Sequence, residues 1–233
     1  MTNSLDLFIF KHMRKILAFI FCLFSLKLLA VLPDPVKEFN YEKMKLLQDV
    51  LTEDFSTNKS LDTTFELPGL IALSYYPELI NHHIRFQQKN IKTTMQSVPR
   101  LDFIFRSREK RVYKISIDNK VRNKKGLLLK DVPFNAQIGV IGHELAHVVD
   151  YDSKSKMGIV FLGIGYLFPG KRRQIENRVD EITIAHGLGN QVKDFSGFVL
   201  NNPDLNERYL KYKRKFYYKP NQLMRIMLRY PIY

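Results

Sequence analysis

Residues 134–150, with the sequence FNAQIGVIGHELAHVVD, constrain the fold of this chain more than any other stretch. Their apolar residues recur at helical spacing and predict one helix with an apolar face. His143 and His147 are four residues apart, so on that helix their imidazoles project from the same side and can converge on one point. This spacing is typical of metal ligands. The predicted apolar face consists of Ile138, Ile141, Leu145, Val148 and Val149.

Glu144 directly follows the first of the two histidines. A catalytic zinc site takes three ligands from the protein and leaves the fourth position to water, whose pKa the metal lowers to about 7. A glutamate at this position points toward the water rather than toward the metal, where it can accept a proton and pass it to a leaving amine. We therefore predict that Glu144 is a general base and acid.

A third ligand is expected from a second helix over residues 171–189, which Gly187 would end. This helix carries Glu176, our predicted third ligand, with Glu181 as the alternative acid. Asp180 lies one turn after Glu176 and can hydrogen-bond a ligating imidazole and fix its tautomer. Asp150, seven residues after His143, is a weaker candidate for the same supporting role, and a surface acid at the helix end is its alternative.

Together, HELAH and the later ENRVD resemble the gluzincin metallopeptidases, the thermolysin-like zinc enzymes with HExxH on one helix and ExxxD on a later one. The resemblance covers about residues 135–189, less than a third of the chain. It implies a Zn²⁺ ion bound by His143, His147 and Glu176, with Glu144 as the catalytic residue. It also implies an α+β fold, a mainly helical zincin-like domain whose small sheet flanks the HExxH helix.

The resemblance leaves one role open, because no residue matches the histidine or tyrosine that stabilises the oxyanion in that family. His186, Tyr217 and Tyr218 are candidates, and a structural role is the alternative for each. For the motif itself, the alternative is coincidence, since HExxH also arises by chance in unrelated helices.

Two neighbouring zinc classes and one histidine pair are excluded by the residues. A metzincin needs Gly at 150 and His at 153, where this chain has Asp150 and Ser153. Peptide deformylase takes its third ligand from a cysteine, and the only cysteine is Cys22, near the N-terminus. His82 and His83 are adjacent, so on the predicted helix they would diverge by about 100° and could not chelate one ion.

The region before the motif is expected to contain two helices and a hairpin. The segment 34–54 reads as an amphipathic helix, and a second helix is predicted to begin at Pro77 with Ile80, Ile84 and Phe86 inward. The segments 100–105 and 111–118 predict a hairpin. Alternation along the second of these strands predicts one buried and one solvated face, and its free edge could pair with an extended peptide.

An uncharged segment, GIVFLGIGYLF over 158–168, follows the motif. It is too short to span a bilayer, which needs roughly 20 apolar residues. We expect a buried hairpin segment here; the alternatives are the wall of an apolar pocket and a segment that dips into a membrane.

Residues 1–30 have the layout of a signal peptide, in which basic KHMRK precedes the apolar run 16–26 and Ala30 offers a cleavage site. The alternative is an uncleaved membrane anchor. We expect an exported protein, periplasmic or extracellular, in which residues 31–233 form one domain. Because Cys22 lies in the apolar run, disulfides cannot stabilise that domain.

The chain is strongly basic, with a formal net charge of +14. After Glu207 no acid remains, and basic and aromatic residues alternate in a tail over about 208–233. Such a tail could contact an anionic membrane surface; a solvated basic helix is the alternative. A nucleic-acid partner is not expected, because the signal peptide argues against one.

These patterns together predict a zinc metallopeptidase that hydrolyses bonds in a peptide or protein substrate. The alternative is a non-catalytic exported zinc-binding protein whose basic tail binds an anionic surface. An open coordination position would discriminate between the two.

Overall fold

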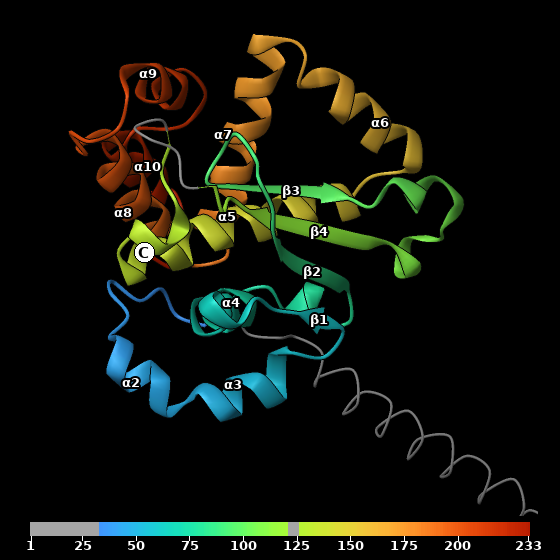
Figure 1. Cartoon of the computed structure of the whole chain (residues 1–233), viewed down its shortest axis with the longest axis horizontal. Helices are drawn as coiled ribbons and strands as arrows, with labels where there is room; N and C mark the ends of the chain where they lie inside the picture. The colour runs from blue at the N-terminus through green and yellow to red at the C-terminus, as the bar shows by residue number, and fades with distance from the viewer. Residues whose placement is uncertain (1–32, 121–125) are drawn as a thin grey trace, which may run out of the picture. The chain divides into compact units, whose positions relative to one another are not determined.

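Helix α5 (Phe134–Asp152) is the central element of the fold, and helices and a sheet pack on several of its sides (Figure 1). The computed structural model describes residues 33–120 and 126–233. Residues from Leu32 to the C-terminus form one compact unit. The other α-helices of the described residues are α2 (Tyr41–Leu46), α3 (Gln48–Phe55), α4 (Glu66–Ser74), α6 (Lys156–Gly165), α7 (Pro169–Ala185), α8 (Gly189–Leu200), α9 (Glu207–Phe216) and α10 (Pro220–Met227).

The sheet of the described residues is mixed, with the strand order β1-β2-β4-β3. Strands β1, β2 and β4 run parallel, and β3 is antiparallel to β4, with Met95 opposite Ile117 and Pro99 opposite Tyr113. Strand β3 is therefore an edge strand, and it packs against α5. The strands are β1 (Lys59–Ser60), β2 (His83–Gln88), β3 (Met95–Pro99) and β4 (Val112–Ile117). Helices and a small mixed sheet make this an α+β protein, as expected.

The predicted hairpin forms, but its first strand lies earlier in the chain than expected. Residues Leu101–Phe105 form a 3-10 helix rather than a strand, and the ion pairs of Asp102 with Arg100 and Arg106 help to close this turn. The second predicted strand is confirmed as β4. The predicted solvated face of this strand was wrong, because Ser116 and Asp118 are buried and Lys114 is half-buried. Strand β4 also has no free edge, because β2 and β3 pair with its two sides; the edge strands of the sheet are β1 and β3.

The predicted helix from Pro77 was wrong. Residues Pro77–Leu79 form one 3-10 turn, and the chain then enters β2. Ile84 and Phe86 do point inward, but at the two-residue period of a strand. Of the adjacent histidines, His82 pairs with Asp152 (Nε2 to Oδ1, 3.2 Å) and neither belongs to a metal cluster in the described part of the chain.

The predicted amphipathic helix over 34–54 is two short helices, α2 and α3. The first begins only after Asn40, whose side-chain oxygen accepts a hydrogen bond from the Lys43 amide at 3.0 Å. The two helices meet at Leu47, and neither contains a fully buried residue. They pack as a cover on the core through partly buried side chains such as Met44 and Leu51.

The apolar segment 158–168 is mostly helix α6, and the expected buried hairpin was wrong. Only Ile159 and Leu162 of this helix are buried. Phe161 is 64% exposed and Leu167, just after the helix, is 78% exposed. A run of apolar residues here marks a surface rather than a core.

The basic C-terminal segment is part of the folded domain and not a free tail. Helix α9 contributes Tyr209, Leu210 and Phe216 to the buried residues. Helix α10 forms a second, smaller core against α7 and α8 through Leu223 and Ile226. The aromatic and apolar residues among the basic ones are therefore explained by packing.

The predicted signal peptide or anchor over 1–30 lies outside the described residues. Within the described ones, no helix combines the length and the apolar character that crossing a bilayer requires.

Candidate metal centre

The two histidines of α5 and a glutamate of α7 meet in the interior. One ligand atom from each of His143, His147 and Glu176 lies within 4.8 Å of the others. Glu176 Oε2 is 3.3 Å from His143 Nε2 and 3.5 Å from His147 Nε2. All three side chains are buried. The structure thus brings together the three predicted ligands, with both Nε2 atoms directed at one carboxylate oxygen.

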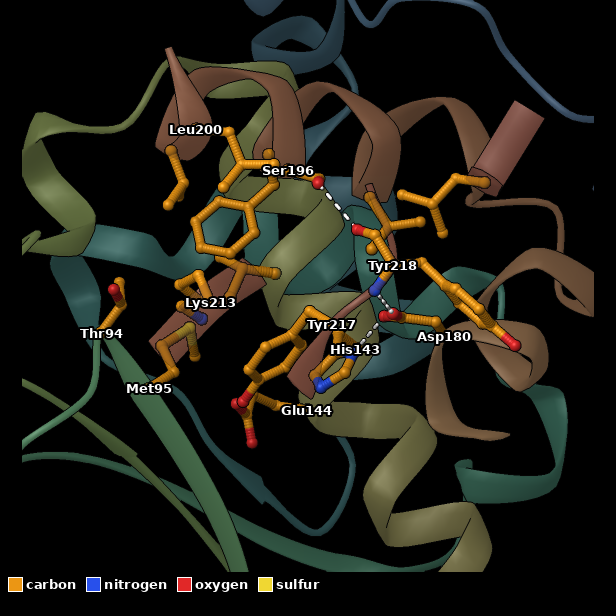
Figure 2. A pocket seen from close by; sticks show the side chains of 15 residues that line it. Thr94, Met95, His143, Glu144, Asp180, Ser196, Leu200, Lys213, Tyr217 and Tyr218 are labelled. Carbon is orange, nitrogen blue, oxygen red and sulfur yellow. Dashed lines mark hydrogen bonds and ion pairs between the residues drawn. The ribbon is translucent and has the colours of Figure 1, made fainter. Parts of the chain in front are cut away.

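Asp180 lies one turn after Glu176 on α7, so both carboxylates face α5. Its Oδ1 atom is 2.8 Å from His143 Nδ1 (Figure 2). A carboxylate at this distance favours a proton on Nδ1, so that Nε2 is the atom that can ligate a metal once its own proton is released. The Tyr218 backbone amide donates to Asp180 Oδ2 at 3.4 Å, which anchors the carboxylate from its other side.

Asp150 does not take the supporting role that its position suggested. Its carboxylate binds Lys154 Nζ at 2.6 Å and the Arg178 guanidinium at 2.7 Å, so it ties α5 to α7 as an ion pair. Among the described residues, His147 Nδ1 has no hydrogen-bond partner. The two histidines are therefore supported unequally. The reason is that the fold places an acid behind His143 and none behind His147.

Glu144 is buried beside the cluster, and its Oε2 atom has no hydrogen-bond partner in the described part of the chain. Burial raises the pKa of this carboxyl above its ordinary value, while the nearby charges of His147, His143 and Lys213 act in the opposite direction. A buried carboxylate oxygen without a hydrogen bond is costly, which makes Glu144 a candidate for contact with a ligand or a water molecule.

The cluster also shifts the proton affinity of its own members. Burial lowers the pKa of His143, but hydrogen bonds and charges from Asp180 and Glu176 outweigh it and raise that pKa to about 10. Burial alone would raise the pKa of Glu176, yet the two histidines hold it well below its ordinary range. In the metal-free protein, a proton on His143 thus balances the negative charge of Asp180 and Glu176.

Two cavities open onto the cluster. The larger, about 730 Å³, is lined by strand β3 and helix α6 and reaches Glu144, His147 and Glu176. The smaller, about 40 Å³, lies on the other side of Glu144 and His143, and Figure 2 shows Lys213 and Tyr217 at its wall. The larger one is a cleft that could admit an extended ligand up to the cluster.

Of the three oxyanion candidates, the structure places only Tyr217 between the two cavities. Its ring lies 5.7 Å from that of His143, and burial raises the pKa of its hydroxyl well above the ordinary value. His186 instead pairs with Glu78 at 2.7 Å, and the Tyr218 hydroxyl donates to Glu181 at 3.0 Å. Glu181 is thereby engaged elsewhere and is not in the metal cluster.

Sequence reasoning missed two residues of the site. Tyr151 follows His147 by one helical turn and stacks on it, with ring centroids 6.0 Å apart, so its spacing alone could have identified it. Lys213 is buried among aromatic rings, with its Nζ atom 4.2 Å from the centre of the Tyr217 ring. No motif signals this lysine, because it stands in a run of basic residues that otherwise face solvent.

The chain matches no family model, no curated protein and no solved structure.

Proposed function

We propose that this protein is a zinc-dependent peptidase of the gluzincin kind, in which His143, His147 and Glu176 hold the ion. One observation carries the proposal: three ligand atoms lie within 4.8 Å of one another, and Glu144 beside them keeps a buried carboxylate oxygen without a partner. Two imidazoles and one carboxylate are a donor set of catalytic zinc sites. A purely structural zinc site uses a fourth protein ligand, and the described cluster offers three.

A zinc ion at this position would supply the Lewis acidity that activates water. The chain's own residues supply the proton transfers. Glu144 lines both cavities, and from there its carboxylate can accept a proton from an attacking water and donate it to the leaving amine. Its raised pKa suits this exchange, because a base works best when its pKa approaches the working pH.

Tyr217 and Asp180 have supporting roles. The raised pKa of Tyr217 keeps its hydroxyl protonated, so that it can donate a hydrogen bond to the negative charge that develops on a substrate carbonyl. Asp180 positions the His143 ring. Both side chains line the smaller cavity beside the cluster, which supports these roles.

The form of the cleft favours a peptide as the substrate. The edge strand β3 runs along it, and an extended peptide can add to such an edge. Tyr151 of α5 donates a hydrogen bond to the Ser97 carbonyl at 3.1 Å, which ties this strand to the helix that carries Glu144. A bound peptide would therefore lie at a fixed distance from the general base.

The test is the variant E144Q, assayed by digestion of a peptide library and by metal analysis. Glutamine fills the same space but cannot accept the proton, so we expect bound zinc to remain and kcat/KM to fall roughly 10²–10⁴-fold. Cleavage at the wild-type rate by E144Q would remove Glu144 from the mechanism.

Metal content tests the ligands separately. We expect E176A to lose most of its zinc and E181A to keep it, because only the first carboxylate faces the histidines. If wild type holds zinc but neither cleaves peptides nor binds a hydroxamate, the site is non-catalytic and the proposal fails.

A further inference from the structure

Many of the exposed apolar side chains of residues 33–120 and 126–233 lie near one cleft. Of the sixteen large apolar side chains that are exposed in the described residues, eight belong to two short segments. The first segment is the turn after β3, and the second is α6 with the residues that follow it. We call them the turn rim and the helix rim: the turn rim exposes Leu101, Ile104 and Phe105, and the helix rim exposes Met157, Phe161, Ile164, Leu167 and Phe168.

Both rims border the cleft that leads to the metal cluster. Leu101 and Ile104 line it from the turn rim, and Ile159 and Val160 line it from α6. Figure 1 shows α6 and the connection from β3 to β4 near each other, beyond the arrowhead of β3. Exposed apolar side chains thus belong to two of the segments that border the cleft.

A peptide inside the cleft would not cover this surface. Phe161, Leu167 and Phe168 are each more than half exposed, and none of them lines the cleft. An occupant that buries them must therefore be broader than a single extended chain.

The charges around the helix rim are of one sign. Residues 153–173 contain five Lys or Arg and no Asp or Glu. Lys156, Lys171 and Arg173 are exposed, and no carboxylate of the described residues lies within 4.0 Å of them. The turn rim is mixed but basic on balance: Asp102 is paired with Arg100 and Arg106, and the exposed bases Arg108 and Lys110 flank the exposed Glu109. A second copy of the chain would bring like charges together, which disfavours a symmetric dimer through this face.

Apolar and aromatic side chains bordered by Lys and Arg are the composition of surfaces that insert into the interface of an anionic bilayer. We propose that the two rims form a docking surface for anionic lipid, which sets the mouth of the cleft against a membrane. The apolar side chains enter the boundary between headgroups and acyl chains, and the bases contact lipid phosphates. This docking does not depend on the peptidase proposal.

The chain contains no tryptophan, which allows a specific test. In the full chain, the variant F161W carries its single indole on the helix rim, and the control L46W carries it on α2, where Leu46 is 85% exposed. Each is mixed with vesicles of phosphatidylcholine and phosphatidylglycerol that contain a brominated lipid quencher. We expect F161W emission to shift to the blue and to be quenched, and L46W emission to stay unchanged.

Two further measurements make the test independent of any other membrane contact of the chain. Pure phosphatidylcholine vesicles should quench F161W much less. Replacing Lys156, Lys171 and Arg173 with Gln in F161W should raise the vesicle concentration for half-maximal quenching about fivefold per charge. Sedimentation of F161W with the vesicles without quenching overturns the proposal. So does a blue shift that grows with protein concentration in the absence of lipid, since a second copy would then cover the rim.

If the peptidase proposal also holds, the docked cleft favours substrates at the membrane surface, an inference that rests on the proposed function. The same peptide is assayed in two forms. One form is free in solution, and the other carries an acyl chain that holds it on anionic vesicles. Faster cleavage of the vesicle-bound form supports the inference. Equal or slower cleavage overturns it and leaves the peptidase function standing, whereas no cleavage of either form counts against the function itself.

Discussion

Helices α5 and α6 follow one another in the chain and are both rich in apolar residues, yet their burial is opposite. In α5, fifteen of nineteen residues are buried, including two histidines and two acids. In α6, two of ten are buried, although the helix has no charged residue after Lys156. The difference shows that the number of neighbouring layers, and not the apolar content of a helix, determines how many of its residues are buried.

The physical reason lies in the partners of each helix. Helix α5 is enclosed by α4, β3, α7 and α8, so even its polar side chains lie inside. Helix α6 rests on the domain through Ile159 and Leu162. Apolar residues are usually buried and charged residues exposed. Helix α5 departs from this rule because it buries charged residues, and α6 departs from it because it exposes apolar ones. Such departures are expected at functional sites.

The largest expected effect is on the close approach of α5 and α8. A Cβ atom at Gly139 would lie 2.2 Å from the Gln191 carbonyl carbon and oxygen. Because backbone atoms cannot rotate away, we expect G139A to lower the free energy of unfolding by about 3 kcal/mol or more. Urea denaturation measures it. If G139A had the same free energy of unfolding as wild type, the prediction would be wrong, because α8 could then move away from α5 without cost.

A smaller effect is expected at Asp180, on the affinity of the site for zinc. The variant D180A removes the carboxylate that holds His143 and should lower the affinity for zinc roughly 10–100-fold. D180N should recover part of this loss, because the amide oxygen still accepts from Nδ1. D150N is the matched control, since its carboxylate pairs with Lys154 and Arg178 and not with a ligand. Competition with a chromophoric chelator measures the zinc affinity of D180A, D180N and D150N. An equal loss in D150N would contradict the positioning role of Asp180.

The pH dependence of zinc affinity tests the same region. In the metal-free protein the pKa of His143 is raised to about 10, so at neutral pH this ring carries a proton that a metal must displace. Affinity should therefore rise with pH, by up to about tenfold per unit for one released proton, until the pH passes that pKa. Chelator competition across the neutral range gives the slope. A flat profile would mean that His143 is already neutral.

The smallest effect is expected in α6. A Cβ atom at Gly163 meets nothing within 4 Å. Alanine lowers the entropy of the unfolded chain, so G163A should raise the free energy of unfolding by up to about 1 kcal/mol. It is the counterpart of G139A in the same denaturation experiment. Destabilisation by G163A would show that α6 packs more tightly than its exposure indicates.

The elements that sequence reasoning identified best are those with a long, regular period. The helix of the motif extends two residues beyond the expected end. The helix with Glu176 ends at Ala185, two residues before Gly187, whose φ of +88° is of the kind glycine tolerates. Short apolar runs were less certain. Ile84 and Phe86 fit a helix or a strand, and only the pairing of β2 with β4 selects the strand.

The residues of the site also divide into those that the helical period predicts and those that depend on tertiary contacts. The spacing of His143, His147 and Glu144 follows from one helix, and the period of α7 places Asp180 behind Glu176. Nothing in the spacing could show that Asp150 would instead pair with Arg178, because their separation depends on the angle between α5 and α7. Lys213 comes from a distant helix and enters the site only through packing.

The sequence by itself determined which side chains share a helix face, because the helical period is a local property of the backbone. It therefore specified the pair of histidines, the glutamate beside them and the later acids. Only the tertiary contacts bring the carboxylate of Glu176 to both imidazoles, place β3 at an edge of the sheet, and leave the apolar surface of α6 exposed. These outcomes depend on how many layers cover each element, and contacts between residues far apart in the chain decide that number.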